Sequence, residues 1–222
     1  MRRSRPRLQL GLVLATALVV AASFAGTEHL LDQALHHLPT LVVLPLLAVA
    51  ARRRWLGDGA FAATILFLWI HTLGARYLYS FVPYDDWARA VLGKSVTETF
   101  GFRRNHYDRL VHAAYGFLLT FPQVELLERR LGTRAALGTS LALVLAVGSL
   151  YEMAEWGVAI TLDPVHADRY NGQQGDAWDA QKDTALAFLG AIVATGALAL
   201  SRKDLSSPGA CGARPRSPRA TG

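Results

Sequence analysis

Acidic and histidine residues recur at helical spacing inside segments that are otherwise apolar. Residues three or four positions apart lie on one face of an α-helix, and such pairs occur in three separate segments. With a histidine in a fourth segment, the set comprises His71, Asp108, His112, Glu152, Glu155, Asp179 and Asp183. A charged side chain at the centre of a membrane-spanning helix costs about 2.5 to 3.5 kcal/mol on insertion scales. These side chains therefore require mutual pairing, water or a bound cation.

Imidazole and carboxylate groups on facing helices are ligands that suit zinc, iron or manganese. We predict a divalent-metal site whose ligands are His71, His112, Glu155, Asp179 and Asp183. A metal at such a site lowers the pKa of a bound water molecule, which can then attack an ester or a phosphate. The residues predicted to act as catalytic acid or base groups are Asp108, Glu152, Glu155 and Asp183.

Two arginines stand close to these residues in the sequence. A guanidinium can bind a phosphate or carboxylate through two hydrogen bonds, so Arg76 and Arg109 are predicted to hold an anionic substrate group. The alternative is that they form salt bridges with the same carboxylates. Asp176 and Asp179 have an alternative as well, since their spacing fits a helix N-cap followed by an acidic residue at the third position. The sequence leaves both alternatives open.

The other histidines are predicted to lie on the surface. His106 and His166 occur in polar stretches between apolar segments. His29, His36 and His37 are close enough in sequence for a weak surface metal site, although proximity along the chain is poor support for one.

Six apolar segments must position these side chains. Each approaches or exceeds the roughly 20 residues with which a helix crosses a bilayer, and each is apolar all round, unlike the amphipathic helices of soluble proteins. We predict an all-α polytopic membrane bundle with spans near 8–26, 36–51, 60–80, 106–124, 135–161 and 179–201. The second segment is short and contains Pro39 and Pro45. A single membrane domain at 8–201 would follow a basic tail at 1–7 and precede a tail at 202–222 that is predicted to be disordered.

The first apolar segment has two interpretations. Ser23 and Ala25 form a small-x-small cleavage pattern behind a basic start, as in a signal peptide. The apolar run from Leu8 to Gly26 is longer than the roughly 7 to 15 residues of a signal-peptide core, which favours an uncleaved anchor.

The charges are distributed unequally over the two ends of the predicted bundle. Of 23 Lys and Arg residues, 15 fall at the end that carries both termini and 8 at the other end. Because cytoplasmic loops are enriched in Lys and Arg, both termini are predicted to be cytoplasmic. All seven histidines and 13 of the 17 acidic residues then fall on the outer side, so the net +6 divides into +11 inside and −5 outside.

Composition also excludes some functions. The basic residues stand at the ends of apolar segments and do not form a solvent-facing groove, so no nucleic-acid partner is expected. A single cysteine, Cys211, excludes a disulfide framework and any multi-cysteine metal site. The expected partners are the lipid bilayer and a lipid or anionic small molecule.

Several motifs together resemble a known family. They are His71, Arg104–Arg109 with His112 and Gly116, Tyr151–Trp156, and Gln174–Asp183. In this order they are similar to the YjdF-like bacterial inner-membrane proteins, a family of unknown function, over about residues 8–200. Thr184 and Asn171-Gly172-Gln173 depart from the family's pattern and leave the ionisable positions unchanged. A fainter similarity to VanZ-like membrane proteins rests on the order Asp-x-x-x-His, Glu, Asp on successive helices. The resemblance implies a multi-pass protein of the bacterial inner membrane.

Three functions fit these residues. The first is a metal-dependent hydrolase or transferase that acts on a lipid-linked or anionic substrate at the outer membrane face. The second is a small ion- or proton-coupled transporter that uses the same side chains as a relay. The third is a non-catalytic assembly factor in which the polar residues only hold the helices together.

Overall fold

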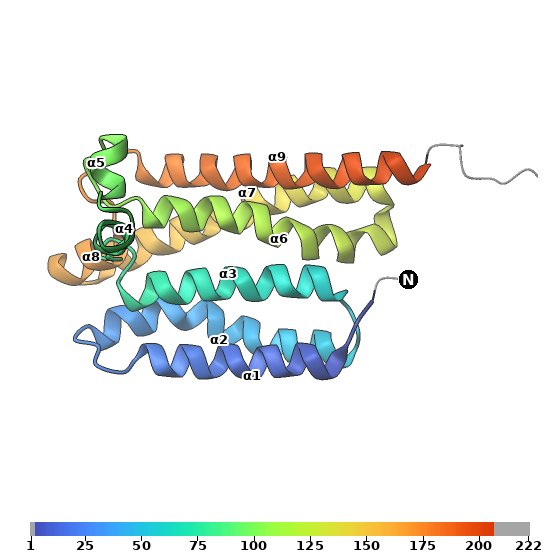
Figure 1. Cartoon of the computed structure of the whole chain (residues 1–222), viewed down its shortest axis with the longest axis horizontal. Coiled ribbons are helices and arrows are strands. Elements are labelled where there is room, and N and C mark those ends of the chain that lie inside the picture. The colour runs from blue at the N-terminus through green and yellow to red at the C-terminus, as the bar shows by residue number, and fades with distance from the viewer. Residues whose placement is uncertain (1–2, 207–222) are drawn as a thin grey trace, which may run out of the picture.

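The computed structural model describes residues 3–206, and these form nine helices and no strand (Figure 1). Six helices are long and apolar enough to cross a membrane, namely α1 (Pro6–Ser23), α2 (Leu30–Arg52), α3 (Asp58–Arg76), α6 (Tyr107–Leu131), α7 (Thr133–Thr161) and α9 (Asp179–Ser206). Three are short, namely α4 (Tyr84–Leu92), α5 (Val96–Phe100) and α8 (Pro164–Asn171). The predicted all-α bundle with six spans is confirmed.

The long helices form two groups of three. Helices α1, α2 and α3 pack together, α6, α7 and α9 form the second group, and α3 lies against α6 where the groups meet. The three short helices gather at one end of the bundle, on the left of Figure 1, and α1 begins and α9 ends at the opposite end. The connections from α3 to α6 and from α7 to α9 therefore lie at the same end of the bundle, which we call the capped end.

Helix α2 begins well before the predicted start of the second span. Its first turns contain Asp32, Gln33, His36 and His37, all nearly inaccessible to solvent. Polar residues lower the mean hydropathy of a segment, so a search for apolar runs misses a helix end whose polar side chains point inward. The predicted surface location of His36 and His37 is wrong, since each is about 1 % exposed.

Helix α3 is shorter than predicted, because the chain turns sharply after Arg76. Leu78 and Tyr79 have φ values of 48° and 55°, in the left-handed region that non-glycine residues adopt at a cost. Helix α9 continues through Ser206, and the rest of the predicted disordered tail, 207–222, lies outside the described residues. The turn at Leu78 and Tyr79 returns the chain to the bundle instead of extending the helix.

The sides of the bundle expose apolar side chains. Leu14 and Leu18 on α1 and Leu150 on α7 are more than 60 % exposed, and many others line the remaining long helices. A soluble monomer rarely exposes so much contiguous apolar surface. These sides are therefore suited to contact with lipid.

Candidate functional site

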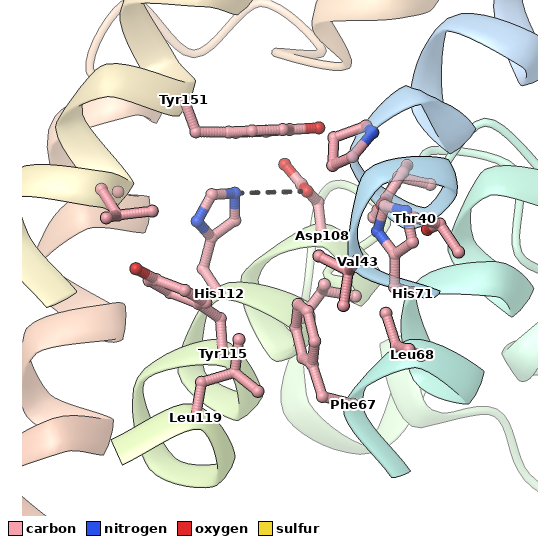
Figure 2. Close-up of a pocket in the computed structure, with 15 residues that line it drawn as sticks. Thr40, Val43, Phe67, Leu68, His71, Asp108, His112, Tyr115, Leu119 and Tyr151 are labelled. Atoms are coloured by element: carbon pink, nitrogen blue, oxygen red, sulfur yellow. Dashed lines mark hydrogen bonds and ion pairs between the residues drawn. The ribbon is translucent and has the colours of Figure 1, made fainter. Parts of the chain in front are cut away.

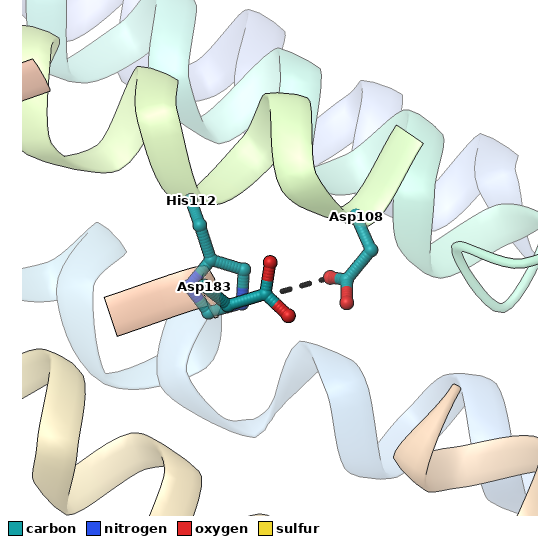
Figure 3. Close-up of side chains that lie close together, drawn as sticks. All are labelled: Asp108, His112 and Asp183. Carbon is teal, nitrogen blue, oxygen red and sulfur yellow. Dashed lines mark ion pairs between the residues drawn. The ribbon is translucent and has the colours of Figure 1, made fainter. Parts of the chain in front are cut away.

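Three of the predicted site residues converge near the capped end of the bundle. Asp108 and His112 stand one turn apart on α6, and Asp183 faces them from α9 (Figure 3). One ligand atom from each residue lies within 4.8 Å of the others, as in a group able to hold a metal ion. We call these three residues the carboxylate–histidine group. Its Asp183 is 2 % exposed, and Asp183 Oδ1 has no hydrogen-bond partner among the described residues.

Two glycines bring Asp183 to His112. A Cβ atom at Gly116 would lie 1.7 Å from the carbonyl oxygen of Ala187, and one at Gly190 would lie 2.3 Å from the carbonyl oxygen of Ala113. Backbones of helices approach this closely only where side chains are absent. Gly116 is one turn from His112, and Ala187 is one turn from Asp183. The close approach of α6 and α9, one turn along each helix from the group, therefore holds His112 and Asp183 near each other.

Helix α7 adds two carboxylates beside the group. Glu152 Oε1 lies 3.5 Å from His112 Nε2, which is also 3.6 Å from Asp108 Oδ1. Glu155 lies one turn further on the same helix. Carboxylates gathered around one histidine repel one another strongly in a medium of low dielectric constant. A cation would offset this repulsion.

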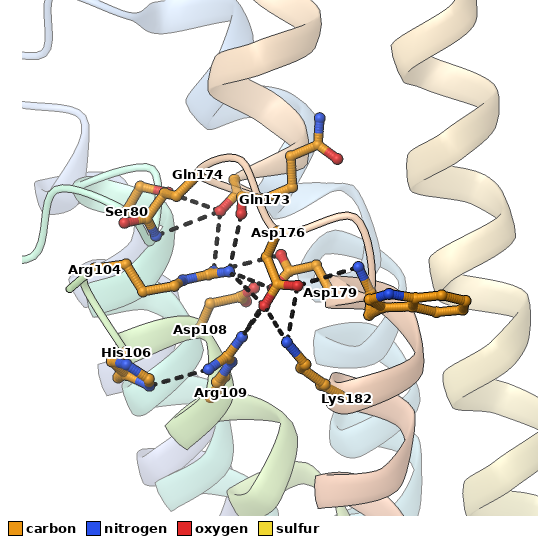
Figure 4. Close-up of polar contacts among 12 residues, drawn as sticks. Ser80, Arg104, His106, Asp108, Arg109, Gln173, Gln174, Asp176, Asp179 and Lys182 are labelled. Carbon is orange, nitrogen blue, oxygen red and sulfur yellow. Dashed lines mark hydrogen bonds and ion pairs between the residues drawn. The ribbon is translucent and has the colours of Figure 1, made fainter. Parts of the chain in front are cut away.

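Two further acids, Asp176 just before α9 and Asp179 at its first position, have cations of their own (Figure 4). Arg104 Nη1 lies 2.5 Å from Asp179 Oδ1, and Arg109 Nη2 lies 2.5 Å from Asp176 Oδ2. Lys182 Nζ donates to both oxygens of Asp176, at 2.8 and 2.6 Å. This ammonium, together with the Trp178 backbone N–H, lowers the pKa of the Asp176 carboxyl to about 2. We call Arg104, Arg109, Asp176, Asp179 and Lys182 the ion-pair network.

The ion-pair network bears on three predicted roles. Asp179 binds Arg104 and is absent from the three residues that converge as a metal-competent group. Arg109 binds Asp176 and approaches Asp179 to 3.5 Å, which corresponds to the salt-bridge alternative. Arg76 donates to the carbonyl oxygens of Ala25 and Gly26, at 3.2 and 3.4 Å, and does not reach the carboxylate–histidine group.

A cavity of about 210 Å³ opens beside the group (Figure 2). Asp108, His112 and Tyr151 form one wall, and His71 stands on the opposite wall. Most of the remaining lining is apolar, from Val43, Phe67, Leu68, Val111, Leu119 and Val147. An apolar cavity of about 150 Å³ accommodates benzene. This one has room for a short apolar segment of a ligand whose polar part faces the carboxylates.

His71, a predicted metal ligand, forms hydrogen bonds through both of its ring nitrogens. Its Nε2 lies 3.0 Å from the carbonyl oxygen of His36, and its Nδ1 is hydrogen-bonded to the hydroxyl of Tyr79. With both ring nitrogens engaged, the structure does not bring His71 into the carboxylate–histidine group.

Comparison with known proteins identifies the family. Residues 8–204 match the family described as "Predicted membrane protein (DUF2238)". The chain belongs to this family. It is 32 % identical over 157 residues to the inner membrane protein YjdF of Escherichia coli (strain K12), a match that covers 69 % of this chain and 71 % of that protein. No solved structure matches. The resemblance seen in the sequence motifs is confirmed for the YjdF-like family.

Sequence reasoning missed two contributors to the site of this DUF2238 protein. Arg104 belongs to the Arg104–Arg109 motif but was given no role in the site, although two arginines five positions apart and two aspartates three positions apart could have suggested paired segments. Thr40 lines the cavity, and its hydroxyl has no partner among the described residues. Nothing in the sequence distinguishes this threonine from others in apolar segments.

Proposed function

We propose that this membrane protein is a metal-dependent hydrolase or transferase that acts on a lipid-linked or anionic substrate. The carboxylate–histidine group would hold a divalent cation, and the adjoining cavity would receive the apolar part of the substrate. The observation that carries this proposal is the convergence of Asp108, His112 and Asp183 from two helices, with Asp183 Oδ1 buried and without a partner among the described residues.

The chemistry of the three side chains supports a divalent metal ion as the bound species. Two carboxylates and one imidazole suit zinc, manganese or iron. Three protein ligands also leave a position for water, as in catalytic zinc sites. A bound divalent cation would supply a water molecule of lowered pKa. Glu152, whose Oε1 lies 3.5 Å from His112 Nε2, would take a proton from such a water.

Metal binding by purified protein tests this function. We expect the full chain in detergent to bind about one equivalent of zinc or manganese. Because each variant removes a ligand, His112→Ala and Asp183→Asn should weaken binding at least about 100-fold. Isothermal titration with each metal gives the affinity, and metal analysis after dialysis gives the stoichiometry.

The matched control is His29→Ala, which removes a histidine from the loop before α2 and should bind metal as the wild type does. Asp183→Asn keeps the size of the side chain, so thermal unfolding can separate a lost ligand from a lost fold. Wild-type protein that binds no more metal than Asp183→Asn would refute the proposal.

We further propose that the capped end of the bundle faces the periplasm and that both termini lie in the cytoplasm of a bacterial inner membrane. The support is the excess of Lys and Arg at the end where α1 begins and α9 ends. The carboxylate–histidine group would then be open to the outer face of the membrane.

Cysteine labelling tests the orientation. Cys211 is the single native cysteine, and in spheroplasts it should react with a membrane-impermeant maleimide only after lysis. In a Cys211→Ser background, Val91→Cys on α4, where the side chain is 82 % exposed, should react without lysis. The opposite pattern of labelling would invert the topology.

A further inference from the structure

The wall of the cavity opposite the carboxylate–histidine group holds a second chain of polar contacts. A carbonyl oxygen only accepts hydrogen bonds, so His71 Nε2 must carry the proton that it shares with the His36 carbonyl, 3.0 Å away. In the neutral imidazole, Nδ1 is then an acceptor, and the hydroxyl of Tyr79 donates to it. The contacts thus fix both the tautomer of His71 and the direction of the Tyr79 proton.

The turn after α3 is shaped to place this tyrosine. Left-handed φ values at Leu78 and Tyr79 reverse the chain, and the Tyr79 N–H donates to the Gly74 carbonyl oxygen at 2.7 Å. The Tyr79 ring then lies on Gly74, where a Cβ atom would be 2.7 Å from Tyr79 Cε1. Backbone in sparsely populated regions persists where the surrounding structure enforces it, and it clusters at functional sites. A simple connection to α4 requires none of these features.

Two other tyrosines in or near the cavity, Tyr115 and Tyr107, donate to backbone carbonyl oxygens. The hydroxyl of Tyr115, which lines the same cavity, donates to the carbonyl oxygen of Val144 at 3.3 Å. The hydroxyl of Tyr107 donates to the carbonyl oxygen of Ile70 at 2.9 Å. A backbone carbonyl satisfies a hydroxyl but cannot take its proton. Tyr79 differs from Tyr107 and Tyr115 because its acceptor is a histidine.

We propose that Tyr79 is the nucleophile of a second catalytic centre, with His71 as its base and the His36 carbonyl as the group that orients the imidazole. A nucleophile hydrogen-bonded to a base that a third group orients is the arrangement by which hydroxyl side chains become reactive. His71 and Tyr79 line the same cavity as Asp108 and His112. The reacting group would therefore lie between the two walls.

The substrate would be an ester of an amphiphile, which rests on the proposed function. Tyr79 Oη would bond to the phosphoryl or acyl centre, the bond to the leaving oxygen would break, and the tyrosine proton would pass through His71 Nδ1 to that oxygen. Water would then add to the same centre, give a proton back through His71, and release Tyr79 as the hydroxyl. The net change is hydrolysis of one ester bond, with no oxidant or reductant.

A lipophilic sulfonyl fluoride tests the nucleophile without the natural substrate. When an alkyl-substituted benzenesulfonyl fluoride reacts with Tyr79, an O–S bond forms, fluoride leaves and the proton moves to His71. In detergent-solubilised full chain, peptide mass spectrometry should find the label on Tyr79 and not on Tyr115. Because His71→Gln removes the base while keeping an amide that can donate to the His36 carbonyl, its labelling should be about 100-fold slower.

Two glycine variants test the proposal even if the His71→Gln variant does not fold. Gly74→Ala should displace the Tyr79 ring and slow labelling, whereas Gly59→Ala on the same helix, with no atom within 4 Å of the new Cβ, should label as the wild type does. Labelling should not change with a chelator, so a failed metal site leaves this result intact. Equal labelling of Tyr79 and Tyr115, or undiminished labelling of His71→Gln, would overturn the proposal.

Discussion

Replacing Gly116 by valine is expected to cause a severe loss of stability. The new Cβ would lie 1.7 Å from the carbonyl oxygen and 2.6 Å from the carbonyl carbon of Ala187. These are backbone atoms, so no side-chain rotation relieves the overlap, and α6 and α9 must move apart. Overpacking usually costs about 1 to 3 kcal/mol, occasionally more, and this contact should reach or exceed the upper end. Thermal unfolding in detergent measures the effect.

The matched control for Gly116→Val is Gly196→Val on α9, where no atom lies within 4 Å of the added Cβ. Both variants introduce the same β-branched residue into a long helix, so they differ mainly in the contact. The separation of α6 from α9 should also carry Asp183 away from His112 and abolish metal binding in any protein that still folds. Equal melting temperatures for the two variants would contradict the packing of α6 on α9.

The architecture was largely predictable because a bilayer constrains sequence strongly. A span needs about 20 apolar residues, and the six long helices all contain such runs. The predicted helix boundaries were inaccurate where polar side chains are buried or where a turn interrupts an apolar segment. His36 is polar and yet almost fully buried at the start of α2, and the turn at Tyr79 ends α3 within a stretch that reads as helix. Tertiary contacts determine both, and no local pattern reports them.

The candidate site was predictable to the level of helix faces. Spacing placed Asp108 with His112 on one helix face, and the predicted ligand set placed Asp183 with His112; in the structure these three side chains lie close together. Spacing could not predict which acidic residue pairs with an arginine and which joins the carboxylate–histidine group. Asp179 and Asp183 share a face of α9, but the first meets Arg104 from a loop 75 residues away in sequence, and the second meets His112. This division depends on which residue of the loop reaches the helix end.

The partners of the acidic residues therefore change along α9, from cationic side chains at its start to a histidine and a carboxylate one turn further in. Asp176, just before the helix, and Asp179, its first residue, face three cationic side chains and also stand where the positive end of the helix dipole favours acids. One turn further in, Asp183 faces His112 and the carboxylate of Asp108. The outer acids thus have permanent partners within the chain, whereas the inner ones are suited to a cation that can come and go.

Removal of Arg104 should show how strongly the outer acids depend on their partners. The side chains of Arg104 and Asp179 are only 10 % and 9 % exposed, so Arg104→Met leaves a nearly buried carboxylate without its closest cation. Breaking a buried pair from one side costs about 3 to 5 kcal/mol, and the low end is expected here because Arg109 remains 3.5 Å from Asp179. Thermal unfolding of the variant in detergent measures the loss.

A second substitution separates the unpaired charge from other consequences of losing Arg104. Asp179→Asn in the Arg104→Met background removes the uncompensated carboxylate, so the double variant should be more stable than Arg104→Met alone. Arg89→Met is the control, because its pairs with Asp86 and Glu98 are exposed and such pairs contribute about 0 to 1 kcal/mol. If Arg104→Met and Arg89→Met lost the same stability, the ion-pair network could not be what holds the start of α9, and with it Asp183, in place.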